Sequence, residues 1–123
     1  MKRILIIDEV GFSRVCSAIL ELEGHKVEVI EDIENLSLKL DNKEFSLIIT
    51  SYPFGSVLFE ALKKLDLPTI ILTPHINKEI INLLKGFDNS YCLIKPIDYQ
   101  KFRTLVNQLV DCDSNKIGEY NIL

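Results

Sequence analysis

The fold is decided by the stretch Phe45-Ser-Leu-Ile-Ile-Thr-Ser-Tyr-Pro-Phe-Gly55. Leu47 to Ile49 is apolar at consecutive positions, and Thr50-Ser51 then leads into a turn at Pro53. A short run of this kind indicates a strand that is buried on both faces, in the middle of a parallel sheet. Ser51 would then lie at the carboxyl end of a central strand, where open α/β sheets place their ligand sites.

The composition is that of one folded domain. With 123 residues and a hydrophobic content of 47%, the chain is long enough to bury a core. Its net charge of −4 gives no general attraction to nucleic acid or to an anionic membrane, and we expect neither as a partner. No apolar run approaches the roughly 20 residues of a membrane span and no secretory segment opens the chain, so we expect a cytoplasmic protein.

Three cysteines, Cys16, Cys92 and Cys112, are scattered along the chain. None of their spacings is that of a zinc or redox site, and the simplest interpretation is reduced thiols in a cytosolic protein. No histidine is placed as a base beside a Cys or Ser nucleophile, because His25 and His75 fall in other loops. We therefore predict that the chain is not an enzyme.

Strand-like and helix-like segments alternate five times. Besides the central strand, the expected strands are Arg3–Ile7, Val27–Ile30, Pro68–Thr73 and Tyr91–Ile94. Apolar residues three or four positions apart mark the helices between them. These residues are Phe12, Val15, Ile19 and Leu22; Ile33, Leu36 and Leu40; Val57, Leu58, Ala61, Leu62 and Leu65; Ile80, Ile81 and Leu84; and Phe102, Leu105, Val106 and Leu109. The alternation predicts an open, doubly wound parallel sheet with helices on both faces.

Local signals set the limits of several elements. Gly24 can end the first helix in a left-handed conformation, and Asn77 and Asp98 can cap the fourth and fifth helices. Glu28, between apolar neighbours, places Val27–Ile30 at an edge of the sheet. The predicted domain covers residues 1–111, and the polar residues 112–123 are expected to be a frayed tail, or else the start of a linker or a small partner-binding segment.

Polar side chains gather at the carboxyl ends of the expected strands. Because parallel strands end at one edge of a sheet, these side chains should face a common crevice. They are Asp8, Glu9, Thr50, Ser51, Thr73 and Lys95.

The ordered set resembles the receiver domain of bacterial two-component response regulators, from about Lys2 to Val110. Ile-Leu-Ile-Ile-Asp8-Glu9, with Arg14 a turn later, is similar to the first strand and acidic pair of that family. Ile-Ile-Leu-Thr73 is similar to its fourth strand with the hydroxyl residue. Leu-Ile-Lys95-Pro96 is similar to its fifth strand and the lysine–proline that follows, a bond that is usually cis in the family.

This resemblance implies a flavodoxin-like (βα)5 fold with the parallel strand order 2-1-3-4-5. In the family, a phosphoryl group passes from a partner's phosphohistidine to an aspartate that ends the third strand. The acidic pair and that aspartate hold Mg²⁺, while the hydroxyl and the lysine contact the phosphoryl oxygens.

The position of the phosphoacceptor is occupied here by Ser51, and no Asp or Glu occurs from Phe45 to Phe59. A serine hydroxyl is a weak nucleophile without a nearby base, and the loss of one carboxylate weakens Mg²⁺ binding. The resemblance therefore predicts a degenerate acceptor position, no catalytic residue and no cofactor, with at most weak Mg²⁺ binding at Asp8 and Glu9.

Asp8, Glu9, Thr73 and Lys95 are then interpreted as a vestigial phosphorylation pocket. Because these residues share a crevice, Lys95 can contact an acid of the pair instead of a phosphoryl oxygen. We expect its ammonium to form an ion pair with Asp8 or Glu9, in the space that phosphoryl chemistry would use.

The predicted function is that of a pseudo-receiver, which signals through protein contacts. In the family, the contact face is built from the fourth helix, fifth strand and fifth helix, here about residues 77–86, 91–94 and 98–110. Candidate contact residues are Lys85, Tyr99, Gln100, Lys101 and Arg103. The expected partner is a signalling protein such as a histidine kinase or an output domain, and a homodimer is left open.

Two alternatives remain open at this point. One is a conventional phosphorelay receiver that binds Mg²⁺ and accepts a phosphoryl group at an unusual position. The other is a nucleotide- or flavin-binding doubly wound domain, which is disfavoured because Asp8-Glu-Val-Gly11 supplies acids where a phosphate needs backbone amides.

Overall fold

A computed structural model describes residues 3–30, 45–52, 54, 58–64, 67–87, 89–111 and 119–122. The strands are β1 Arg3–Ile7, β2 Val27–Ile30, β3 Phe45–Ser51, β4 Thr69–Thr73, β5 Asn89–Ile94 and β6 Glu119–Ile122. The helices are α1 Val10–Leu22, α3 Phe59–Lys63, α4 Lys78–Leu84 and α5 Tyr99–Asp111. The predicted helical stripe of Ile33, Leu36 and Leu40 lies outside the described residues, as do Val57 and Leu65 of the next one.

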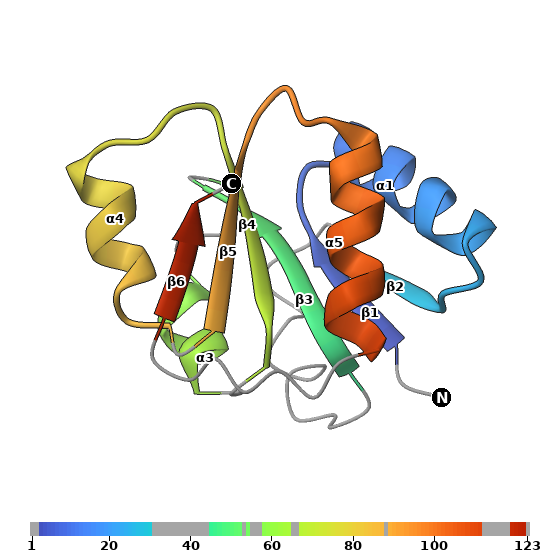
Figure 1. Cartoon of the computed structure of the whole chain (residues 1–123), viewed down its shortest axis with the longest axis horizontal. Coiled ribbons are helices and arrows are strands. Elements are labelled where there is room, and N and C mark those ends of the chain that lie inside the picture. Colours follow the sequence, from blue (N-terminus) through green and yellow to red (C-terminus); the bar gives the residue numbers. More distant parts are fainter. Residues whose placement is uncertain are drawn as a thin grey trace.

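All the strands run parallel in one sheet, in the order β2-β1-β3-β4-β5-β6 (Figure 1). The predicted order 2-1-3-4-5 is confirmed, with β2 at one edge as Glu28 suggested. β3 lies between β1 and β4, and its residues are buried from Phe45 to Ser51 except for the half-buried Ser46. The central strand is therefore where its unbroken apolar run placed it.

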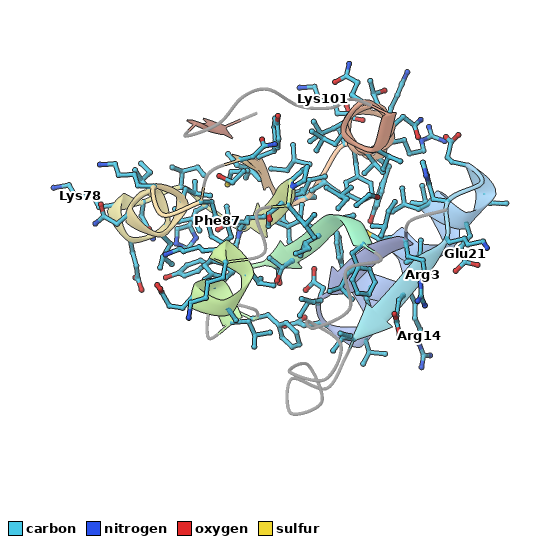
Figure 2. The ribbon with its side chains drawn as sticks, turned by 90° about the horizontal axis from the view of Figure 1, so that it is seen from below. Arg3, Arg14, Glu21, Lys78, Phe87 and Lys101 are labelled. Carbon is cyan, nitrogen blue, oxygen red and sulfur yellow. The ribbon has the colours of Figure 1, made fainter. Side chains whose placement is uncertain are left out.

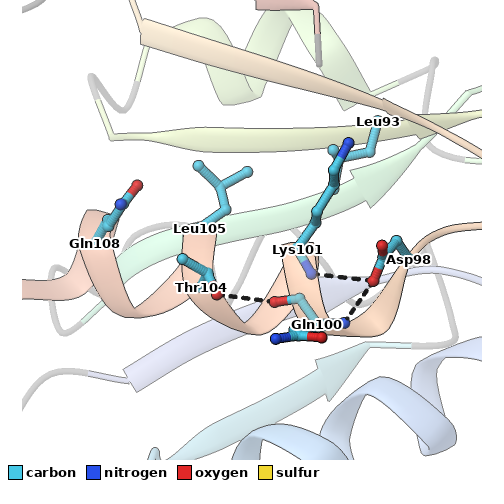
Figure 3. A pocket seen from close by; sticks show the side chains of 7 residues that line it. All are labelled: Leu93, Asp98, Gln100, Lys101, Thr104, Leu105 and Gln108. Atoms are coloured by element: carbon cyan, nitrogen blue, oxygen red, sulfur yellow. Dashed lines mark hydrogen bonds between the residues drawn. The ribbon is translucent and has the colours of Figure 1, made fainter.

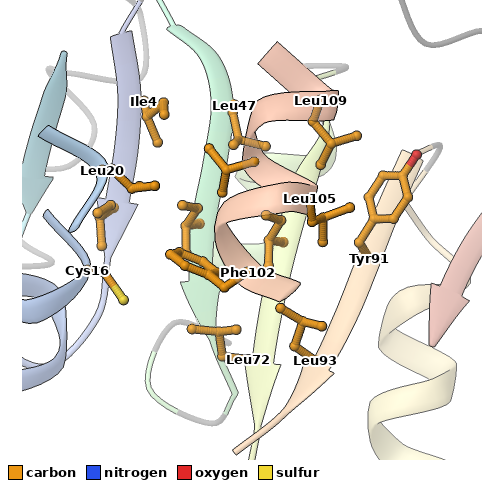
Figure 4. Close-up of a cluster of buried hydrophobic side chains, with 14 residues drawn as sticks. Ile4, Cys16, Leu20, Leu47, Leu72, Tyr91, Leu93, Phe102, Leu105 and Leu109 are labelled. Atoms are coloured by element: carbon orange, nitrogen blue, oxygen red, sulfur yellow. The ribbon is translucent and has the colours of Figure 1, made fainter. Parts of the chain in front are cut away.

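Two apolar cores lie on the two faces of the sheet. On one face, α1 and α5 pack against alternate strand residues, as the close-up in Figure 4 shows for Cys16, Leu47 and Phe102. On the other face, α3 and α4 pack against the intervening strand residues, such as Ile48 and Ile71. The predicted core positions of α5 are confirmed, since Phe102, Leu105, Val106 and Leu109 are all buried.

The predicted core face of α1 is wrong in part: Phe12 packs against the core, but two of the other predicted residues do not. Val15 is 46% exposed and Leu22 is 89% exposed, whereas the buried residues of this helix are Ser13, Cys16 and Leu20. Ser13 can be buried because its hydroxyl donates to the Val10 carbonyl oxygen at 3.1 Å, which satisfies the polar group within the helix. The stripe of large apolar residues therefore identified the packed face of α1 only at Phe12.

The predicted helix limits are largely confirmed. Gly24 has φ +91° just after α1, a conformation that glycine adopts without strain. The Asn77 side chain accepts from the Ile80 backbone N–H at 3.0 Å. Asp98 Oδ1 accepts from the backbone N–H groups of Gln100 and Lys101 at 2.9 and 3.2 Å.

The C-terminal residues differ from the expected frayed tail. Glu119–Ile122 form β6, which pairs in parallel with β5 in the register Asn89↔Glu119 to Cys92↔Ile122. No local pattern predicts this strand, because four residues are too few for an alternation pattern to stand out and the pairing partner is distant in the chain.

Among the described helices, none combines the length and the apolar character that a membrane crossing requires.

Candidate functional site

The candidate site is built around Asp8, which follows β1 directly and is 0% exposed. The strand brings the carboxylate to the carboxyl edge of the sheet, between the ends of its neighbours β2 and β3. The backbone N–H of Glu9 donates to Asp8 Oδ1 at 2.7 Å. A buried carboxylate must be compensated by donors and by a counter-charge, so the groups around Asp8 define the site.

Ser51 supplies the second donor to Asp8. The parallel pairing of Ile7 with Thr50 aligns the ends of β1 and β3, and the Ser51 hydroxyl donates to Asp8 Oδ1 at 2.7 Å. Ser51 itself is only 2% exposed. The residue at the predicted acceptor position is therefore turned towards Asp8, and its hydroxyl proton is engaged in the hydrogen bond to that carboxylate.

Lys95 supplies the counter-charge. Its Nζ lies 3.6 Å from Asp8 Oδ2, which is an ion-pair distance but too long for a hydrogen bond. The predicted ion pair is therefore confirmed, with Asp8 as the partner. The same ammonium lies 4.3 Å from the centre of the Phe12 ring, close enough for a cation–π interaction.

Phe12 is a site residue that the sequence interpretation missed. The sequence places it only in the apolar stripe of α1, whereas in the structure its ring makes a cation–π contact with the Lys95 ammonium. The available signal was its position, four residues after Asp8 in the first turn of α1. Together the ring and the carboxylate hold the lysine head group at the sheet edge.

Thr73 and Glu9 are not drawn into this cluster. The Thr73 hydroxyl donates to the His75 carbonyl oxygen at 2.9 Å, within its own loop. The Glu9 residue is exposed, and only its backbone N–H contacts Asp8. Of the predicted pocket residues, the structure thus joins Asp8, Ser51 and Lys95. The Thr50 hydroxyl is buried and has no hydrogen-bond partner among the described residues.

The buried thiol of Cys16 reports the electrostatics of this region. Burial, followed by the negative charge of Asp8, raises the pKa of Cys16 from 9.0 to about 12, although the Lys95 charge acts to lower it. Burial alone raises the pKa of Cys92 to about 11. Both thiols are protonated and unreactive near neutral pH, which agrees with the interpretation of Cys16 and Cys92 as reduced thiols, whereas Cys112 lies outside the described residues.

The cluster fits a Mg²⁺ ion poorly. Mg²⁺ needs several oxygen ligands in near-octahedral arrangement, and Asp8 has both carboxylate oxygens already next to donors or to an ammonium. Within the part of the chain that the structure describes, no three His, Cys, Asp or Glu side chains come close enough to hold a metal.

The predicted contact residues lie at the surface. Lys85, Tyr99, Gln100, Lys101 and Arg103 are all exposed. Figure 2 shows Lys101 on the outer side of α5 and Lys78 on the outer side of α4, beyond opposite faces of the sheet.

Two of the predicted contact residues also line a groove beside α5. Gln100 and Lys101 border this hollow of about 440 Å³, whose apolar floor includes Leu93 and Leu105 (Figure 3). Arg103 differs from them, because its guanidinium reaches Glu23 beyond α1 at 3.9 Å.

Comparison with solved structures identifies the architecture. A two-component response regulator from Clostridium difficile superimposes with a TM-score of 0.78 at 20% identity, over 93% of this chain and 100% of that one. The CheY-like receiver domain protein from Methanospirillum hungatei JF-1 gives a TM-score of 0.73 at 25% identity, over 90% and 94%. The non-phosphorylated HemR receiver domain from Leptospira biflexa gives 0.78 at 20%, over 93% and 98%.

No protein-family model and no curated protein sequence matches the chain. The strand order, the helices on both faces and the cis bond between Lys95 and Pro96 all agree with the resemblance seen in the sequence. The chain has the fold of the response regulator receiver domains.

Proposed function

We propose that this chain is a pseudo-receiver, a receiver-type domain that signals by protein contact without phosphorylation of an aspartate. The observation that carries the proposal is the hydrogen bond of 2.7 Å from the Ser51 hydroxyl to the buried Asp8 carboxylate. It stands at the position where the family resemblance places the phosphoacceptor.

Two properties of Ser51 argue against its taking over as the acceptor. A hydroxyl attacks phosphorus effectively only when a base removes its proton, and carboxylates as a class are weak bases for a serine hydroxyl. Ser51 is also almost completely buried, so an incoming phosphodonor would have to open the site before it reached the oxygen.

Lys95 and Asp8 have a structural role in this proposal. In a working receiver the lysine is available to a phosphoryl oxygen, whereas here it neutralises Asp8 and packs on Phe12. Thr73, which would be the second donor to a phosphoryl group, is engaged with the backbone of its own loop. We assign Asp8, Glu9, Thr73 and Lys95 to a vestigial pocket with at most weak affinity for Mg²⁺.

Incubation with a small-molecule phosphodonor and Mg²⁺, followed by intact mass measurement, tests the proposal. We expect no mass gain in the wild-type chain and none in Ser51→Ala. A gain of one phosphoryl group in the wild type, acid-labile or acid-stable, would overturn the pseudo-receiver and favour the conventional phosphorelay receiver with an unusual acceptor.

A Mg²⁺ titration followed by amide chemical shifts tests the metal separately. We expect only small shifts at Asp8 and Glu9, without saturation at millimolar Mg²⁺. Saturation with local shifts at both residues, abolished in Asp8→Asn, would show that a competent metal site has survived.

We propose that the output passes through the surface of α4, β5 and α5 to a signalling partner, such as a histidine kinase or an output domain. Tyr99, Gln100, Lys101 and Lys85 are exposed there, and the groove between α5 and β5 offers an apolar floor with polar walls. A partner isolated with the wild-type chain should be lost on Tyr99→Ala or Lys101→Glu. It should be kept on Lys64→Glu, a control at an exposed position after α3.

A further inference from the structure

The helix α1 has a second apolar face, directed away from the sheet. Its buried residues are Ser13, Cys16 and Leu20. On the opposite side of the helix, Val15 is 46% exposed and Leu22 is 89% exposed. Packing on the sheet requires only one apolar face, and a helix that is apolar on two opposite sides is normally covered on both.

This exposed face has the spacing of a coiled-coil seam. Gly11, Val15, Ala18 and Leu22 are all exposed, and they follow one another at intervals of four, three and four residues. The same alternation separates the a and d positions of a heptad repeat. A Cβ added at Gly11 would meet no atom of the described residues within 4 Å outside the local helix, so this end of the face is open. We call these four residues the α1 seam. Its spacing is suited to contact with another helix.

The side chains of the α1 seam alternate in size in a way that suits a second copy of the same helix. When two such helices run antiparallel, an a position of one faces a d position of the other. Val15 then faces Ala18 of the second copy, and Leu22 faces Gly11 of the second copy. Each large side chain meets a small one, which is the arrangement that fills the space between two helices.

Charged residues beside the α1 seam match in the same register. Arg14 and Glu21 are exposed on one side of the seam, and Figure 2 shows both side chains on the outside of the molecule. In the antiparallel register described above, Arg14 of one copy lies beside Glu21 of the other, and the two-fold axis repeats the pair. The Ser17 hydroxyl donates to Glu21 at 2.7 Å, which leaves the negative charge of the carboxylate in place. This match of opposite charges favours a second copy as the occupant of the seam.

We propose that α1 pairs with α1 of a second copy, antiparallel and through the α1 seam, to form a homodimer. One face of a 13-residue helix is smaller than the interfaces of about 1,200 Å² or more that hold stable complexes, so the dimer is weak and depends on concentration. The pairs of Arg14 with Glu21 fix the antiparallel direction and add little affinity, because exposed ion pairs contribute little.

Two matched valine variants test the seam. Sedimentation equilibrium of the full chain from about 10 μM to about 1 mM should show a mass that rises towards twice the chain mass. We expect Val15→Ser to raise the Kd of the dimer at least about tenfold, since the substitution removes apolar contact in both copies. The control is Val10→Ser on the same helix, where the native valine is 43% exposed but lies outside the α1 seam. It should leave the Kd within about twofold of the wild type.

Two charge variants test the direction and the identity of the occupant. Arg14→Glu and Glu21→Arg each place like charges side by side in a dimer of that variant, so each variant alone should dimerise more weakly than the wild type. In an equimolar mixture both ion pairs can form between the two variants, and we expect the dimer to return.

A wild-type chain that stays monomeric up to about 1 mM overturns the proposal. So does a dimer that Val15→Ser leaves unchanged, or one that Val10→Ser weakens equally. A mixture of the two charge variants that dimerises no better than either alone overturns the antiparallel pairing with a second copy. All four substitutions lie at exposed positions, and circular dichroism checks that each variant is folded. This inference does not depend on the pseudo-receiver assignment, which the phosphodonor experiment tests by itself.

Discussion

Two regions of the sheet are stabilised by different kinds of interaction. One is the cluster at the carboxyl ends of β1, β3 and β5, and the other is the outer side of β5. At the strand ends, a carboxylate that is 0% exposed is fixed by two hydrogen bonds of 2.7 Å and by the ammonium of Lys95. On the outer side of β5, a four-residue strand is held in a parallel backbone ladder at the edge of the sheet.

The two regions therefore have different capacities for change. Opening the first would expose or separate a buried charge pair, which costs several kcal/mol. Opening the second breaks a few backbone hydrogen bonds that water can replace. In a receiver that switches by phosphorylation, the strand-end pocket is the part that must respond. Here the Ser51 hydroxyl and the Lys95 ammonium are engaged with Asp8, whereas β6 adds a four-residue pairing at the edge of the sheet.

Hydrogen exchange would show this difference most strongly. The amides of β3 should exchange only through global unfolding, whereas those of β6 should exchange through local opening at the edge. We expect at least a hundredfold lower protection in β6, equivalent to about 3 kcal/mol. Equal protection of the two strands would remove the contrast.

Removal of the Lys95 charge tests how much its ion pair with Asp8 contributes to the free energy of unfolding. Lys95→Met keeps an apolar side chain against Phe12 but leaves Asp8 without its cation. Because the lysine side chain is 28% exposed, we expect a loss of about 2–3 kcal/mol in the free energy of unfolding by urea, below the full cost of breaking a buried pair.

The matched control for that variant is Asp8→Asn combined with Lys95→Met. It removes both charges and should recover to within about 1 kcal/mol of the wild type. If the single and double variants are equally stable, Lys95 is not compensating Asp8.

The pH dependence of stability probes the same region through Cys16. Its pKa is raised from 9.0 to about 12 in the folded chain. The unfolded chain therefore loses this proton first, and the contribution of the thiol to stability is complete below pH 9 and falls between pH 9 and 12. Between pH 8 and 10 the wild type should lose about 1 kcal/mol more than Cys16→Ala. Parallel stability curves for the two proteins over this range would contradict the expectation.

The smallest expected effect lies at the start of α5, on the side of the contact face. Asp98→Ala removes the acceptor for the N–H groups of Gln100 and Lys101 and should cost about 1 kcal/mol in unfolding experiments. Asp98→Asn keeps an acceptor and should stay within a few tenths of a kcal/mol of the wild type. If Asp98→Ala left the free energy of unfolding unchanged, the packing of Phe102 and Val106 would be sufficient to stabilise the start of α5.

The elements that the sequence predicted well are those with strong local signals. The apolar run before Ser51 predicted the central strand, and Asn77 and Asp98 predicted two helix starts, since capping needs only residues two or three positions away. The ion pair of Lys95 with Asp8 was also predictable, because the carboxyl ends of parallel strands must meet at one edge.

The features that the sequence did not predict depend on how α1 packs against the sheet. The packed face of α1 was misjudged in part because two small residues, Ser13 and Cys16, are buried there while Val15 and Leu22 are exposed. The ring of Phe12 under Lys95 could not be seen because it depends on how α1 is rotated above β1.

The sequence by itself determined the alternation of strands and helices, the central place of β3 and the absence of a carboxylate at its end, since each of these is written in neighbouring residues. Only the tertiary structure decided that Ser51 turns to Asp8, that the Lys95 ammonium lies against the Phe12 ring, and that β6 pairs with β5. Those contacts join residues that are far apart in the chain, and their geometry follows from the packing of the elements and not from any local preference.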